Sequence, residues 1–101
     1  MPILSIKTTA TDVYFGDERL DSLVFKNGSS AGVLYLRNKQ TNQNTVSASD
    51  YDVSLDSGGT VSLSRFIDGD GIIGPWQAIS DTAGGVTLEI MQIFKGGSRQ
   101  R

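Results

Sequence analysis

Apolar side chains in this chain recur mainly at every second position, which is the repeat of a β-strand and not of a helix. Short segments rich in glycine, asparagine, aspartate and serine interrupt this pattern at nearly regular intervals, and these residue types favour turns. The segments read FGDE, NGSSAG, QTNQN, DSGG, DGDGIIGP and DTAGG. The sequence therefore predicts an all-β fold.

About eight short strands are expected, and with only two prolines in the chain they favour an antiparallel β-sandwich or jelly roll. A closed small barrel is the alternative. A length of 101 residues fits one domain, which we place at residues 1–94 with a flexible basic tail at 95–101. The expected strands are Ile3–Thr9, Asp12–Phe15, Arg19–Lys26, Val33–Lys39, Thr45–Leu55 with a break around Ser49–Asp50, Thr60–Phe66, Trp76–Ser80 and Val86–Phe94.

One segment offers a helix as a rival interpretation. In DERLDSLVF, Leu20, Leu23 and Val24 could share a helical face behind Asp17 as the cap. The apolar run LVF followed by Asn-Gly instead favours a strand that leads into a turn.

Composition argues against several classes of function. The chain has no histidine and no cysteine, so the usual general base, the thiolate nucleophile and the commonest metal ligands are missing, and we expect neither an enzyme nor a cofactor. A formal net charge of −2 gives no basic field for DNA or RNA. The apolar runs are far shorter than a membrane span, and the N-terminus does not resemble a secretory signal.

The segment DGDGIIGPW resembles the start of a calcium loop. Asp68 and Asp70 occupy the first and third ligand positions, but Ile72, Ile73 and Ile79 occupy the fifth, sixth and twelfth. The segment is better interpreted as a tight turn whose isoleucines cover an apolar edge or touch a neighbour, and no metal is expected.

Two other polar or aromatic features have a plain and a functional interpretation. Asp50 and Asp52 flank Tyr51 on one side of a strand, where paired carboxylates could serve acid–base chemistry, but a solvated strand face is favoured because no nucleophile accompanies them. Trp76 could stack on a sugar, but it begins the apolar run WQAI and is predicted to lie in the core.

Two strands carry apolar residues on both faces, which suggests that more than one side is covered. One contains VLYL, and the other is the last strand, where Val86, Leu88 and Ile90 share a face while Met91 and Ile93 share the opposite one. Either a bulge near Ile90–Gln92 switches the inward face, or the outward side meets another chain. The candidate partner-interface residues are Met91, Ile93, Ile72, Ile73, Lys95, Arg99 and Arg101.

The order of features in VYFG…SLVFKNGSSAGVLYLRN…YDVSLDSGGTVSLSRF…GPWQAISDTAGGVTLEIMQIF resembles that of small β-sandwich virion proteins of tailed bacteriophages, particularly the head-decoration, or cement, proteins. The resemblance covers roughly Asp12 to Phe94. It implies a protein made in the host cytoplasm that sits on the capsid surface, often as a homotrimer, and staples neighbouring copies of the major capsid protein. It implies no catalysis and no cofactor.

The alternative function keeps the fold and changes the partner. A tail, fibre or baseplate adaptor that contacts host glycans would use Trp76, Tyr14 or Tyr51 as stacking surfaces. A third possibility, an enzyme or calcium module built on Asp68 and Asp70, predicts that a chelator lowers the melting temperature.

Overall fold

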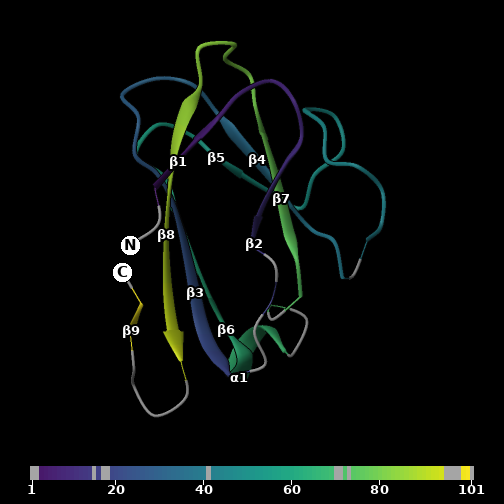
Figure 1. Ribbon diagram of the computed structural model, residues 1–101, viewed down its shortest axis with the longest axis vertical. Helices are drawn as coiled ribbons and strands as arrows, with labels where there is room; N and C mark the ends of the chain where they lie inside the picture. Colours follow the sequence, from purple (N-terminus) through teal and green to yellow (C-terminus); the bar gives the residue numbers. More distant parts are fainter. Residues whose placement is uncertain are drawn as a thin grey trace.

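The computed structural model consists of two antiparallel β-sheets that pack face to face (Figure 1). It describes residues 3–14, 16, 19–40, 42–69, 72 and 74–94, together with the backbone of 99–100. Its elements are β1 (Ile3–Ile6), β2 (Thr11–Tyr14), β3 (Leu20–Asn27), β4 (Leu34–Asn38), β5 (Val53–Leu55), β6 (Thr60–Ser64), α1 (Arg65–Asp68), β7 (Trp76–Ser80), β8 (Val86–Phe94) and β9 (Arg99–Gln100).

The strand order is that of a jelly roll. One sheet has the order β1-β8-β3-β6, with β9 paired to the end of β8, and the other has the order β2-β7-β4-β5. Neither sheet closes on itself within the described strands, so the sandwich prediction is confirmed and the small barrel is wrong. None of the helices in the described ranges is long and apolar enough to span a bilayer.

The core lies between the sheets and is built from the inward residues of both. Phe25 of β3 and Trp76 of β7 meet across it, with ring centroids 5.2 Å apart and planes tilted by 57°. The side chain of Ile72 is buried beside them, and its carbonyl oxygen accepts a hydrogen bond from Trp76 Nε1 at 3.3 Å. The prediction that Trp76 is a core residue is confirmed.

The register of β8 on β3 decides whether a bulge switches the face of the last strand. The pairing runs without a break from Leu23↔Gln92 to Asn27↔Leu88, and the irregularity falls instead near Asp21, between Leu20 and Ser22. A bulge at 90–92 is therefore wrong. Met91 lies on the outer face of the five-stranded sheet, opposite its cross-strand partner Val24.

The favoured strand, and not the rival helix, forms after residue 19, and several expected strands end earlier than predicted, among them Ile3–Thr9, which ends at Ile6. The rival helix at 17–25 is wrong, because Leu20–Asn27 is a strand paired on both sides. Of the expected strand Thr45–Leu55, only Val53–Leu55 pairs with β4, while Ser47 and Asp50 form an isolated bridge in a long connection. The expected strand Thr60–Phe66 stops at Ser64, where a helical turn begins.

The C-terminal tail was expected to be flexible from residue 95 onward. The backbone of Arg99–Gln100 instead forms β9 and pairs antiparallel with Gln92 and Ile93 of β8. β1 pairs with Val86 to Glu89 of β8 on one side and β3 pairs on the other, so β9 pairs with β8 beyond the end of β1 and satisfies backbone groups that β1 leaves open there.

Candidate functional site

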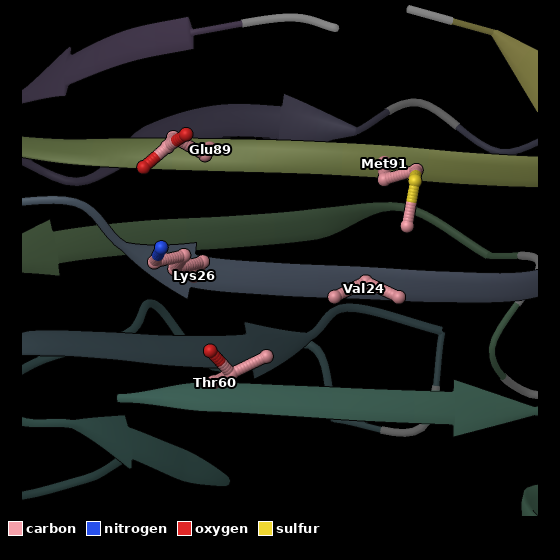
Figure 2. Close-up of a pocket in the computed structure, with 5 residues that line it drawn as sticks. All are labelled: Val24, Lys26, Thr60, Glu89 and Met91. Atoms are coloured by element: carbon pink, nitrogen blue, oxygen red, sulfur yellow. The ribbon is translucent and has the colours of Figure 1, made fainter. Parts of the chain in front are cut away.

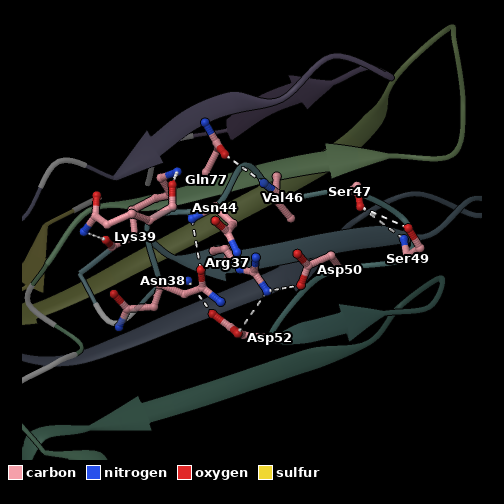
Figure 3. A network of polar contacts seen from close by, with 12 residues as sticks. Arg37, Asn38, Lys39, Asn44, Val46, Ser47, Ser49, Asp50, Asp52 and Gln77 are labelled. Carbon is pink, nitrogen blue, oxygen red and sulfur yellow. Dashed lines mark hydrogen bonds and ion pairs between the residues drawn. The ribbon is translucent and has the colours of Figure 1, made fainter.

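The outer face of the four-stranded sheet is covered by the chain's own connection between β4 and β5, residues 39–52 (Figure 3). Val46 of this connection is buried, and its backbone N–H donates to Gln77 Oε1 at 3.1 Å. Tyr51 packs on Tyr35, with ring centroids 4.9 Å apart. The connection therefore covers part of the outer face of this sheet.

A buried cation fastens this connection. Arg37 of β4 is 2% exposed, and its Nη2 donates to Asp50 Oδ1 at 2.6 Å and lies 3.6 Å from Asp52 Oδ1. Asp52 Oδ2 also accepts from the backbone N–H of Asn38 at 2.8 Å. The Nε and Nη1 of Arg37 have no hydrogen-bond partner among the residues described.

The electrostatics of this cluster fit anchoring better than proton transfer. The hydrogen bond from Arg37 holds the pKa of Asp50 below its usual value, and the same bond raises the pKa of Arg37. Asp50 therefore stays ionised near neutral pH and is a poor general acid. Asp50 and Asp52 are exposed, as the expected solvated face implies, and both carboxylates also contact the buried guanidinium of Arg37, a contact that strand periodicity does not reveal.

The outer face of the five-stranded sheet carries a hollow, whereas the outer face of the other sheet is covered by the connection. A hollow with a volume of about 180 Å³ lies over β3, β6 and β8 (Figure 2). We call this cavity the outer-face hollow. It is lined by Val24, Lys26, Thr60, Glu89 and Met91.

The register explains why these side chains meet. Val24 and Lys26 lie directly opposite Met91 and Glu89, and directly opposite residues of an antiparallel pair project from the same face. Thr60 completes the hollow from β6, where it pairs with Lys26. In Figure 2, Val24 and Met91 lie toward one end of the hollow and Lys26 and Glu89 toward the other.

Two large apolar side chains project from α1, at one end of the molecule (Figure 1). Phe66 is 96% exposed and Ile67 is 80% exposed, and we call this pair the knob. Fully burying such a side chain contributes about 1.5–3 kcal/mol, so the isolated fold leaves that stabilisation unused at two adjacent positions. Adjacent exposed apolar residues of this size are typical of a surface that another molecule covers.

Capping interactions, not burial, hold the turn that carries the knob. Ser64 Oγ accepts from the N–H of Phe66 at 3.2 Å, and Asp68 Oδ2 accepts from the N–H of Ser64 at 2.8 Å. Gly69 ends the turn with φ +82°, which favours glycine, and its N–H donates to Arg65 O at 3.1 Å. Arg65 Nη1 donates to the carbonyl of Leu20 at 3.1 Å and so ties the turn to β3.

The expected partner-interface residues do not form one surface. Met91 and Ile93 are partly buried in β8, with Met91 in the hollow. Ile72 is 3% exposed and belongs to the core, so its proposed contact with a neighbour is wrong. Ile73, Lys95 and Arg101 lie outside the described residues, and for Arg99 only the backbone is described.

Most of the aromatic side chains that the glycan-binding alternative would use are buried. Trp76 and Tyr14 are 4% and 5% exposed, which leaves no face of either ring open for stacking on a sugar. Tyr51 is 41% exposed but packs against Tyr35. At the suspected calcium turn, Asp68 caps α1 and Asp70 lies outside the described part of the chain.

No group of three or more acidic, histidine or cysteine side chains within the described ranges is placed to hold a metal ion. Comparisons with protein-family models, with curated proteins and with solved structures found no match to the chain.

The knob is the feature that strand periodicity missed. Phe66 was assigned to the end of the expected strand Thr60–Phe66. A local signal was present, because Ser64 and Asp68 bracket the segment as a capping pair and Gly69 follows directly.

Proposed function

We propose that the chain is a structural virion protein, a capsid decoration or cement protein that binds the outer surface of a phage head and stabilises contacts between major capsid subunits. The observation that carries the proposal is the knob, with Phe66 96% exposed and Ile67 80% exposed on a capped turn. The jelly roll hosts capsid proteins, lectins and cupins alike, so the proposal depends on this surface and not on the fold.

The energetics of the knob favour a role in adhesion. Burial of both side chains against another protein would contribute about 3–6 kcal/mol per copy before the costs of association, which corresponds to about 100-fold to 10,000-fold in affinity. Aromatic anchors of this kind dominate protein interfaces. On an icosahedral head many copies act together, so a modest contact per copy gives a large total effect.

The knob is also held in a way that suits docking. Ser64, Asp68 and Gly69 fix the turn in the free chain, and Arg65 ties it to β3, so the apolar pair is presented on a pre-organised support. A pre-organised anchor loses less conformational entropy on binding than a mobile loop does.

The test is the heat stability of phage heads. Heads of the phage that encodes this chain are prepared with and without its gene, and the temperature at which they release DNA is measured with a dye. We expect heads without the chain to release DNA at a lower temperature, and we expect purified chain to restore stability when it is added back. Equal release temperatures with and without the chain would contradict the cement role.

Matched variants assign the effect to the knob. The double variant Phe66→Ser and Ile67→Ser should fail to restore stability at concentrations where the wild type succeeds. The control is Tyr51→Ser, which removes an aromatic side chain that is 41% exposed over the four-stranded sheet and should leave restoration unchanged. If the knob variant restores stability as well as the wild type does, the knob is not the docking element.

A further inference from the structure

We propose that the knob of one copy docks into the outer-face hollow of a second copy of this chain. The contact rests on the proposed structural function and makes a neighbouring copy, not the capsid subunit, the partner of the knob, so the knob contributes to cementing by joining copies on the head. The knob sits on α1 at one end of the five-stranded sheet, and the hollow lies over β3, β6 and β8 on its outer face (Figures 1 and 2).

The hollow matches an aromatic ring in size. Its volume is about 180 Å³, and a cavity of roughly 150 Å³ in another protein accommodates benzene. This is below the roughly 300–1,000 Å³ that is usual for small-molecule pockets, so a single side chain fits better than a cofactor. Val24 and Met91 supply its apolar part, and a thioether contacts aromatic rings favourably. The ring of Phe66 is the exposed group of matching size and chemistry.

The charges beside the knob and the hollow are complementary. Lys26 and Glu89 are cross-strand partners at the polar end of the hollow. Arg65 and Asp68 lie three residues apart on either side of the knob. Cβ atoms three residues apart on a helix and Cβ atoms directly opposite in a sheet are both about 5 Å apart, so the two pairs have similar spacing. Docking of the knob can therefore bring Asp68 to Lys26, and Arg65 to Glu89.

The knob does not fill the hollow of its own chain, because Phe66 is 96% exposed and Ile67 is 80% exposed on the turn that follows β6. The contact therefore joins two copies head to tail and leaves one knob and one hollow unoccupied. Repetition of such a contact builds a ring if the rotation closes and an open chain if it does not.

Mixing of two complementary variants tests this geometry. The knob variant carries Phe66→Ser with Ile67→Ser, and the hollow variant carries Met91→Glu, which places a carboxylate where the ring would sit. By sedimentation velocity and native mass spectrometry, we expect concentration-dependent assembly of the wild type and monomers of each variant. Each variant should weaken self-association about 100-fold or more. An equimolar mixture should form a 1:1 heterodimer, because one intact knob then meets one intact hollow.

Several results would overturn the contact. A wild type that stays monomeric at every concentration, a hollow variant that assembles like the wild type, or a mixture that stays monomeric would each do so. Lys26→Glu serves as a second hollow variant if Met91→Glu lowers the melting temperature, because Lys26 is exposed and its replacement is not expected to unfold the sheet. Tyr51→Ser is the control that should assemble normally, because Tyr51 is exposed over the other sheet.

The same variants separate failure of this contact from failure of the proposed function. If the wild type restores heat stability to heads but the wild type and the mixture of variants stay monomeric, the self-contact is wrong and the cement role stands. If the mixture forms the heterodimer but the wild type does not stabilise heads, the self-contact stands and the cement role is wrong.

Discussion

Phe25 and Phe66 are the same residue type in opposite environments, and their replacement by alanine separates the core from the knob. Phe25 is 0% exposed and lies 5.2 Å from the ring of Trp76, whereas Phe66 is 96% exposed. If the knob is a surface for a partner, Phe25→Ala should lower the free energy of unfolding of the isolated chain and Phe66→Ala should not.

The magnitudes follow from burial. Truncation of a buried phenylalanine to alanine costs about 3–5 kcal/mol, a large part of the roughly 5–15 kcal/mol by which small domains are stable. Phe66 leaves about 4% of its surface buried, which is less than roughly 10 Å² of a side chain that can bury about 150–250 Å². At about 25 cal/mol per Å² the loss is about 0.2 kcal/mol, within the range of ordinary surface substitutions.

The assay is urea denaturation of the wild type, Phe25→Ala and Phe66→Ala, followed by tryptophan fluorescence of Trp76 in the core. Low protein concentration keeps self-association from adding to the apparent stability. We expect Phe25→Ala to lower the midpoint strongly and Phe66→Ala to leave midpoint and slope unchanged. A loss above about 1 kcal/mol for Phe66→Ala, far more than its buried area explains, would show that Phe66 stabilises the fold itself and would refute the knob as a free surface.

Three further predictions concern polar groups. The hydrogen bond from the backbone N–H of Val33 is the main reason why the pKa of Asp81 lies below its usual value. Ionised Asp81 therefore stabilises the fold above its unfolded-state pKa, and this stabilisation is lost as the pH falls through the folded-state pKa. The urea midpoints of the wild type and Asp81→Asn should converge in acid. Asp50→Asn should lower the melting temperature by weakening the ion pair of buried Arg37, and Arg37→Met in that background should recover part of the loss in a thermal melt. Asn27→Ala should cost about 1–3 kcal/mol in urea denaturation, because this fully buried amide makes three hydrogen bonds to backbone groups.

Strand periodicity predicted the parts of the fold in which burial alternates. In residues 23–27 of β3 and 86–90 of β8, every second side chain is buried, so spacing two is visible in the sequence. Trp76 was recognised as a core residue for the same reason, because it begins an apolar strand.

The elements that periodicity missed are set by specific polar contacts. Residues 45–52 of the connection were assigned to a strand, but the ion pairs from Asp50 and Asp52 to Arg37 and the hydrogen bond from the Val46 N–H to Gln77 hold this segment over the sheet. The turn at α1 depends on the capping side chain of Ser64, which outweighs the weak strand pattern of its neighbours.

Hydroxyl-radical footprinting of the chain, free and bound to phage heads, tests the central claim most directly because it reads the exposure of individual side chains. If the knob and the hollow are covered in the assembly, Phe66 and Met91 should lose most of their reactivity, while Tyr51, which is exposed over the other sheet, should keep its own. Reactivity of Phe66 on the heads equal to that in the isolated chain would contradict the account.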